Sequence, residues 1–283
     1  MSNKSYLSIY AKSFSWAGYF LPKKTYQKCS TLYKFCRIVD NIADEEGSLD
    51  SKKKNLSNFR NNFNNKNYKE SIIRDMWNLI NEFRISTKII DDLFDGIDSD
   101  LEEKVKLNSQ KDLLIYSYRV AGTVGLMMAK ILNVNNKNAL RSSIDLGIAM
   151  QLTNISRDVM EDAENNRFYI PGNFKSIKET LELADLFYDS SFASIKEIPI
   201  NFRFSILVAR RVYRKIGYNI IKKKNMENYK NSGKIYVNNY SKIIQSILSI
   251  FDFIKLSLTK YEEHFREKEH LIINEKINLD ERF

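Results

Sequence analysis

Two pairs of aspartates have the residue type and the spacing that suit a divalent cation. Asp40 and Asp44 are four residues apart, and so are Asp158 and Asp162, so each pair would project from one face of a helix about one turn apart. Oxygen ligands grouped in this way are typical of Mg²⁺, which keeps several waters and shares its coordination shell with phosphate oxygens. We therefore predict that two helices, far apart in the sequence, face each other and hold Mg²⁺ between their aspartates.

The helix that carries the second pair has further polar residues on the same side. In the stretch 147–163, GIAMQLTNISRDVMEDA, Gln151 and Asn154 share a stripe with the aspartates, whereas Glu161 lies off the stripe and is expected in solvent. Amides and carboxylates on an otherwise apolar helix are costly to bury without a partner. The stretch therefore predicts a bound polar ligand.

Two arginines next to the aspartate pairs indicate the class of that ligand. Arg37 precedes the first pair by one turn, and Arg157 adjoins the second. Together with a metal, guanidinium groups would neutralise a departing diphosphate and promote ionisation of its carbon–oxygen bond. The resulting carbocation needs a dry pocket with aromatic faces, for which 17 Phe and 16 Tyr provide the material. The residues are thus compatible with allylic diphosphate substrates.

Charge and cysteine content limit the partners and the compartment. The formal net charge of +10 favours an anionic partner, but the lysines are scattered and form no stripe with interleaved aromatics, so we expect no nucleic acid. An anionic membrane surface fits better.

Cys29 and Cys36 lack zinc-ligand spacing and are predicted to be free, at least partly buried thiols in a reducing compartment. Because no secretory signal and no apolar run of about 20 residues occur, we expect a cytoplasmic protein that is peripheral at the membrane.

Helices are the elements that would position these residues. The chain has only nine Gly and three Pro, and no stretch of six or more residues alternates like a strand. Helical periodicity predicts helices over 5–21, 23–46, 70–83, 88–98, 113–132, 138–163, 176–195, 200–223 and 235–265. The polar stretch 47–68 is predicted as a loop or a short solvated helix. Gly122 and Gly125 would allow a close helix approach or a local kink.

The C-terminal region is charged and contains both histidines. We place a single all-α domain at residues 1–270 and predict that 271–283 form a frayed tail. His264 and His270 are expected to be exposed surface residues, which argues against a zinc or iron site.

Five motifs occur in order along nearly the whole chain: AKSFSWAGYFLP, LYKFCRIVDNIAD, YSYRVAGTVG, QLTNISRDVMEDAENNRFYIP and KIYV. In this order and at these separations they resemble the phytoene/squalene synthase family of head-to-head prenyl transferases. The resemblance implies an isoprenoid-synthase helical bundle around a central cavity. It also implies two half-reactions on two prenyl diphosphates, through a cyclopropyl diphosphate, with Mg²⁺ as the metal and Mn²⁺ as a substitute.

The resemblance assigns roles to matching positions. The residues that match its two aspartate-rich motifs, and a neighbouring metal ligand, are Asp40, Asp44, Asp158, Asp162 and Asn154. The residues that match diphosphate or substrate contacts are Ser13, Tyr33, Arg37, Gln151, Arg157, Tyr213 and Lys234. The tyrosines that match positions near the cation are Tyr116 and Tyr169. Lys234 stands in place of an Arg, which retains the charge and loses the bidentate geometry. Asn41 stands where many relatives have a second adjacent Asp.

The activity that the resemblance implies is phytoene synthesis, in which two geranylgeranyl diphosphates join 1-1′ without NADPH, in carotenoid biosynthesis. The absence of a hydrophobic C-terminal anchor favours this over a eukaryotic squalene synthase. A C30 dehydrosqualene or squalene synthase using farnesyl diphosphate is the alternative. A non-catalytic relative that serves as an assembly or membrane-surface module is disfavoured, because all four aspartates are present. The oligomeric state is not indicated.

Overall fold

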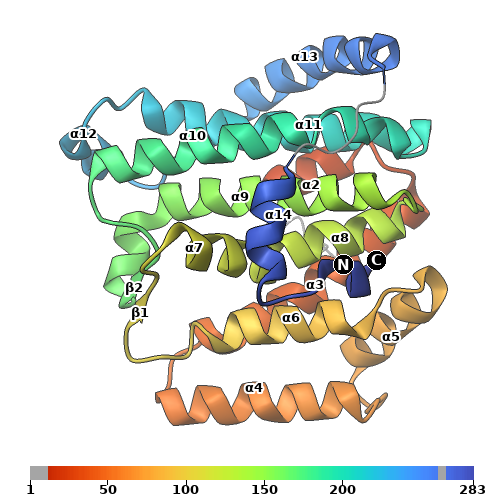
Figure 1. Cartoon of the computed structure of the whole chain (residues 1–283), viewed down its shortest axis with the longest axis vertical. Coiled ribbons are helices and arrows are strands. Elements are labelled where there is room, and N and C mark those ends of the chain that lie inside the picture. Colours follow the sequence, from red (N-terminus) through yellow and green to blue (C-terminus); the bar gives the residue numbers. More distant parts are fainter. Residues whose placement is uncertain (1–11, 261–265) are drawn as a thin grey trace, which may run out of the picture.

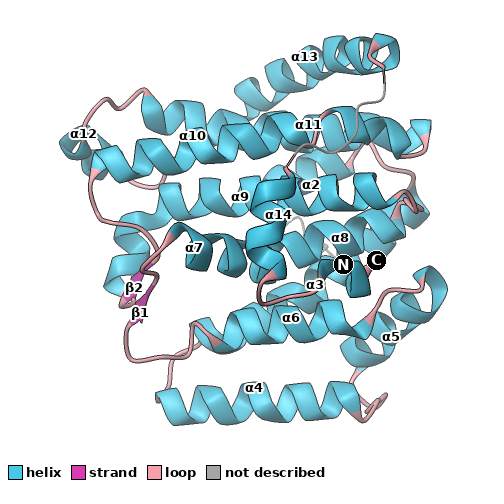
Figure 2. Ribbon diagram, viewed as in Figure 1, coloured by secondary structure: helices cyan, strands magenta, loops and turns pink. Residues whose placement is uncertain are grey.

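The chain forms helices almost throughout, as its shortage of Gly and Pro predicts (Figures 1 and 2). The computed structural model describes residues 12–260 and 266–283. Within them the α-helices are α2 (Lys12–Gly18), α3 (Lys23–Asp44), α4 (Leu49–Asn64), α5 (Ser71–Phe83), α6 (Thr87–Asp98), α7 (Gln110–Ser117), α8 (Thr123–Ile131), α9 (Lys137–Glu164), α10 (Phe174–Ser190), α11 (Ile200–Ile221), α12 (Met226–Asn231), α13 (Asn239–Leu258) and α14 (Glu267–Asn274). Shorter helical segments are the π-helix η1 (Tyr118–Gly122) and the 3₁₀ helices η2 (Ala193–Glu197) and η3 (Leu279–Arg282). The all-α fold class is confirmed.

Helix α9 is the centre of the bundle. It packs against α8, α10, α11 and η1, and its 28 residues include a continuous series of buried positions from Ala139 to Val159. Helix α3 packs against α5, α6 and α8, and α11 lies between α9 and the outer helix α13 (Figure 1). The two helices predicted to carry the aspartate pairs therefore both belong to the core of the bundle.

Two glycines let α9 approach α8 and the preceding η1 closely. A Cβ atom at Gly125 would lie 2.2 Å from the carbonyl oxygen of Ser143, and one at Gly147 would lie 2.3 Å from that of Ala121. Both distances are far below van der Waals contact, so a larger residue would push the helices apart. The close approach predicted for VAGTVG is thereby confirmed, and the backbone beside it departs from α-helical geometry as the π-helix η1.

The polar stretch 47–68 is more ordered than its composition predicts. Ser48 caps α4 by accepting a hydrogen bond from a backbone N–H three residues later. Leu56 and Phe63 are buried, and the Phe63 ring stacks on Trp77 with 5.2 Å between centroids. The loop alternative is therefore wrong, because a few apolar residues at helical spacing hold this segment against the bundle.

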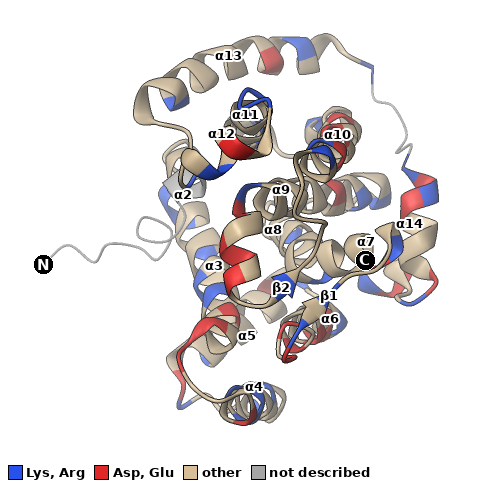
Figure 3. Ribbon diagram, turned by 90° about the vertical axis from the view of Figure 1, so that its left-hand side faces the viewer, with Lys and Arg blue, Asp and Glu red and all other residues tan. Residues whose placement is uncertain are grey.

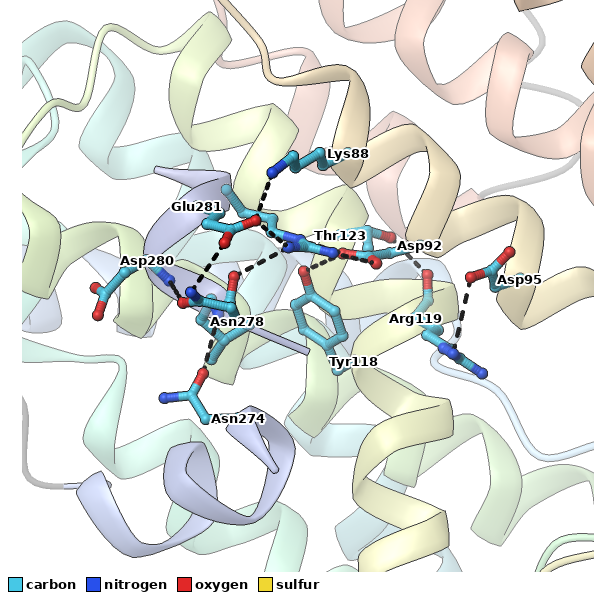
Figure 4. Close-up of polar contacts among 12 residues, drawn as sticks. Lys88, Asp92, Asp95, Tyr118, Arg119, Thr123, Asn274, Asn278, Asp280 and Glu281 are labelled. Carbon is cyan, nitrogen blue, oxygen red and sulfur yellow. Dashed lines mark hydrogen bonds and ion pairs between the residues drawn. The ribbon is translucent and has the colours of Figure 1, made fainter. Parts of the chain in front are cut away.

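The prediction of a frayed tail over 271–283 is also wrong. The apolar side chains of this segment that are buried are Ile273, Ile277 and Leu279. Arg282 donates to both carboxylate oxygens of Asp92 at 2.9 Å. The hydroxyl of Tyr118 donates to the same carboxylate at 2.8 Å (Figure 4). Asp92 is buried, so this pairing compensates its lost hydration and fixes the chain end on α6 and η1.

His270 is buried, contrary to the prediction of an exposed surface histidine. Its Nε2 lies 2.7 Å from one carboxylate oxygen of Asp145, and the hydroxyl of Ser190 donates to the other oxygen at 2.5 Å. These contacts tie α14 to α9 and α10. His264 lies outside the described residues.

Two very short strands join distant loops. β1 (Val105–Lys106) and β2 (Arg167–Phe168) pair in parallel, with Val105 opposite Arg167. The pairing draws the loop after α6 against the loop after α9 at one end of the bundle (Figure 1). Asp100 and Tyr169 thereby become neighbours, although their separation in the sequence does not indicate this contact.

Candidate active site

A cavity of about 340 Å³ lies between α2, α3, α8, α9 and α11. Seven of the predicted site residues line its polar end, namely Tyr33, Arg37, Asp40, Tyr116, Gln151, Asn154 and Tyr213. The remaining wall is mainly apolar and reaches Ala139, at the start of α9. The bundle thus encloses the central cavity that the resemblance implied.

The first aspartate pair stands on the last turns of α3, and each aspartate has an arginine partner. Arg37 donates to Asp40 one turn later on the same helix, and Arg167 donates to Asp44 at 2.9 Å. Burial, and then the charge of Asp44, raises the pKa of Asp40 to about 6. The negative charge at this site is therefore incompletely neutralised, which favours the binding of a cation.

The second pair stands near the end of α9, and its basic partners face only one of the two aspartates. Arg157 donates from Nε to Asp158 at 2.8 Å, and Lys234 lies 3.7 Å from the same carboxylate. The carboxylate of Asp162 makes no hydrogen bond or ion pair within the described ranges. Burial, and then the charge of Asp158, raises the pKa of Asp162 to about 7.

The two pairs are close enough for the same charged groups to act on both. Arg167 opposes the rise in pKa at Asp40 and at Asp162, whereas the carboxylate of Asp100 adds to it at both positions. Charges interact in this way over a few ångströms at a partly buried site. The aspartates of α3 and α9 therefore lie within reach of the same charged groups.

A tyrosine pair and a carboxylate form the wall next to Asp40. The rings of Tyr116 and Tyr169 stack with 4.6 Å between centroids. Their hydroxyls donate to opposite oxygens of Asp100, at 2.8 Å from Tyr116 and 2.7 Å from Tyr169. Burial raises the pKa of both tyrosines well above the usual range, so they remain neutral donors. Of these three residues only Tyr116 lines the cavity. Tyr169 stacks on the Tyr116 ring and Asp100 accepts its hydroxyl, so both hold Tyr116 in place.

The other predicted site residues differ in how far they are buried, from the cavity wall to the protein surface. Gln151 and Asn154 are neighbours on α9, with 3.4 Å between the amide nitrogen of Asn154 and the oxygen of Gln151. Burial raises the pKa of Tyr213 to about 12, so its hydroxyl stays neutral at the cavity wall. Lys234 is exposed, does not line the cavity, and pairs with Glu161 at 2.6 Å. Ser13 is in α2, but its side chain is not among those described.

Two residues of this region have no signal in the sequence pattern. Asp100 stands in the acidic run DSDLEE and looks like a solvated carboxylate, yet it is buried. Arg167 lies in the same motif as Tyr169, but its pairing with Asp44 depends on the strand crossing. A buried carboxylate in a loop has no periodic pattern that would mark it.

Comparison with known proteins identifies the family. The family model for squalene/phytoene synthase matches residues 7–174, which hold both aspartate pairs and both tyrosines. The chain belongs to the squalene/phytoene synthase family. It is accordingly a prenyl transferase, as the five motifs implied.

Similar members of the squalene/phytoene synthase family include bacterial enzymes and one solved structure. The 15-cis-phytoene synthase of Enterobacter agglomerans is 29% identical over 248 residues, which cover 76% of this chain and 83% of the relative. That of a Paracoccus species is 37% identical over 149 residues, 46% of this chain and 49% of the relative. The crystal structure of a dehydrosqualene synthase in complex with ligand has a TM-score of 0.71 at 25% identity, and covers 88% of this chain and 94% of its own. The predicted family and helical fold are confirmed.

Members of this family typically depend on Mg²⁺, and the polar end of the cavity has suitable donors. Across the part of the chain that the structure describes, no three His, Cys, Asp or Glu side chains form a metal cage by themselves. Mg²⁺ needs no such cage, since one or two carboxylates, water and phosphate oxygens complete its shell. Paired aspartates with raised pKa values at Asp40 and Asp162 supply hard oxygen ligands and excess negative charge. This donor set fits Mg²⁺ that is shared with a diphosphate.

Proposed function

We propose that this protein is a phytoene synthase that joins two geranylgeranyl diphosphates 1-1′ through prephytoene diphosphate, a cyclopropyl intermediate, with loss of both diphosphates. The observation that carries the proposal is the length of the cavity. Its lining extends along α9 from Asn154 to Ala139, about 22 Å at the α-helical rise. With C–C bonds of about 1.5 Å, an extended C20 prenyl tail is roughly 19 Å long and a C15 tail roughly 14 Å. The cavity is therefore long enough for the longer tail.

The relatives support the same choice and also define the alternative. Two similar proteins bear the name 15-cis-phytoene synthase, and a similar solved structure is a dehydrosqualene synthase. The alternative for this chain is thus a C30 enzyme that uses farnesyl diphosphate. Condensation to phytoene requires no reductant, so we expect no NADPH site.

Basic residues near the aspartates would bind the diphosphates. Arg37 and Arg157 are planar donors that suit phosphate oxygens, and each pairs with a neighbouring aspartate. Lys234 would add a single positive charge. We propose that Tyr33, Tyr213, Gln151 and Ser13 complete the substrate contacts.

The aspartates are proposed as the ligands of Mg²⁺, together with Asn154. When bound, Mg²⁺ would stabilise the negative charge of the departing diphosphate. Asp40 and Asp44 stand on α3, Asp158 and Asp162 stand on α9, and of these four only Asp40 lines the cavity.

Below its polar end the cavity would exclude water and stabilise the carbocation. The Tyr116 ring borders the cavity, and the stacked Tyr169 and the Asp100 carboxylate lie directly behind it. An aromatic face backed by a negative charge stabilises a nearby cation. The mainly apolar wall keeps water from reaching the cation before the second prenyl chain does.

We further propose a cytoplasmic enzyme that is peripheral at an anionic membrane. Its formal net charge of +10 suits such a surface, and a C40 hydrocarbon product needs an apolar phase in which to dissolve. Nucleic acid is not among the proposed partners.

Product analysis tests the proposed activity. The purified protein is incubated with Mg²⁺ and either geranylgeranyl or farnesyl diphosphate, each with and without NADPH. We expect a C40 hydrocarbon from geranylgeranyl diphosphate that is independent of NADPH. Product from farnesyl diphosphate alone would establish the C30 alternative. The Asp158→Asn variant is the control, and normal turnover by this variant in a folded state would contradict the role of the second pair.

A further inference from the structure

Helix α13 exposes its apolar side and buries part of its polar side. Its exposed large apolar side chains, between 36% and 81% accessible, are Tyr240, Ile243, Ile244, Ile247, Ile250, Phe251, Ile254 and Leu258. They recur every three or four residues and so form one continuous stripe, which we call the α13 apolar face. The buried positions of the same helix include Lys242, Gln245 and Asp252. A helix that only covered the bundle would have the opposite arrangement.

The polar residues of α13 are held inward by specific partners. Asp252 receives a bidentate contact from Arg211 on α11, with 2.8 Å from Nη2 to Oδ1. Ser246 accepts a hydrogen bond from the indole N–H of Trp16 at 2.9 Å. These contacts fix the rotation of the helix about its axis. The outward direction of the apolar face is therefore set by the packing of α13 on α2 and α11.

The charge distribution on α13 suits an anionic surface. Its only acidic residue, Asp252, is buried, whereas Lys255 and the following Lys260 are exposed. Figure 3 shows α13 arched over α11 at the outside of the molecule and mostly without charge. Apolar side chains along a surface helix, with lysines and tyrosines at its edges, are typical of helices that lie in a lipid interface.

The position of α13 relative to the cavity suggests what the face is for. Helix α11 packs against α13 and also lines the cavity with Ser205, Ile206, Ala209 and Tyr213. Trp16 on α2 and Tyr19 just after it extend this apolar surface, and Tyr19 is 76% exposed. Helix α2 lines the cavity as well. The apolar face thus covers the outside of the wall that would enclose a hydrocarbon product.

We propose that the α13 apolar face docks the protein on an anionic lipid bilayer, with the helix lying in the plane of the interface. Among the described residues no helix has the length and hydropathy needed to cross a membrane. A second copy fits the face less well, because two chains of net charge +10 repel each other. The inference rests on the membrane association proposed above and is independent of the prenyl chain length.

Vesicle flotation tests this surface with matched variants. Wild type is compared with Ile247→Glu/Ile254→Glu and with the control Leu186→Glu/Leu271→Glu. Both variants change exposed side chains only, and the control residues lie on α10 and α14. Each is mixed with phosphatidylcholine vesicles with or without phosphatidylglycerol. We expect wild type and the control to float with anionic vesicles, and the α13 variant to lose about tenfold or more in partitioning.

Three results would overturn the proposal. These are equal flotation of all three proteins, no flotation of wild type, or a wild-type dimer that the α13 variant converts to monomer without vesicle binding. Turnover in detergent separates this inference from the proposed activity, because none of the substituted residues lines the cavity. Failure to convert geranylgeranyl diphosphate, with vesicle binding retained, would refute the activity and leave the docking surface standing.

Discussion

The hydroxyl oxygens of Tyr116 and Tyr169 lie 2.9 Å apart, although the two residues are 53 positions apart in the chain. The carboxylate of Asp100 accepts a hydrogen bond from each of them. One buried carboxylate therefore positions both tyrosines and places a negative charge behind the aromatic wall of the cavity.

Replacing Asp100 by Asn tests this arrangement. The amide keeps the shape but removes the charge and one acceptor oxygen, so we expect kcat to fall about 10- to 100-fold, with a smaller change in KM. Steady-state kinetics on the prenyl diphosphate measure both constants. Asp98→Asn is the control, because Asp98 is exposed two residues earlier. Wild-type kcat in Asp100→Asn would show that the carboxylate has no part in turnover.

The raised pKa values of Asp40 and Asp162 predict how stability depends on pH. In the unfolded chain an Asp titrates near pH 3.9, whereas in the folded protein these two titrate near 6 and 7. The folded state thus binds protons more tightly, and the free energy of unfolding of the metal-free protein falls as pH rises from about 4 to about 7.

Thermal unfolding of the Asp162→Asn variant checks this sign. Because the variant cannot ionise at this position, we expect its Tm to exceed that of wild type by a few degrees at about pH 8, and the difference to shrink as pH falls and to vanish only below about pH 4. The measurement is made in a chelator so that no metal offsets the charge. A lower Tm for the variant at about pH 8 would mean that Asp162 is stabilised in its charged form.

The close contact of α9 with η1 predicts a large effect of one methyl group. At Gly147 the new Cβ would overlap the carbonyl oxygen of Ala121, so Gly147→Ala should lower the free energy of unfolding by about 1 to 3 kcal/mol. Gly172→Ala is the matched control, since a Cβ added there would meet no atom within 4 Å. Denaturant unfolding compares the two, and equal stabilities would contradict the tight crossing.

Arg282 near the end of the chain is expected to be structurally important. Arg282→Ala leaves Asp92 buried without its cation, and we expect a loss of about 2 to 4 kcal/mol in the free energy of unfolding. The control is Arg141→Ala, which breaks an exposed pair with Asp280 and should cost less than about 1 kcal/mol. Similar losses in both variants would mean that the tail is not anchored through Asp92.

Local periodicity predicts much of this fold. The helix predicted over 138–163 is Lys137–Glu164, and that predicted over 200–223 is Ile200–Ile221. The stripe from Gln151 to Asp162 follows from helical geometry alone, because all its members are on one helix. Such features need no knowledge of tertiary contacts.

Features that depend on contacts between distant segments could not be predicted in this way. Asp100 becomes a site residue only when β1 pairs with β2, and Arg282 is fixed only by Asp92 on another helix. On α13, apolar spacing indicated a helix but not the direction of its apolar face. That direction is set by the partners of Asp252 and Ser246, which lie elsewhere in the chain.

Competition between two prenyl diphosphates tests the central claim, that the cavity accepts a C20 tail. Wild type is supplied with equal geranylgeranyl and farnesyl diphosphate, and we expect kcat/KM to favour the C20 substrate by at least about tenfold. Ala139→Phe shortens the apolar end and should reverse the preference, whereas Ala139→Ser should keep it. A wild-type preference for farnesyl diphosphate would contradict the assignment as a phytoene synthase.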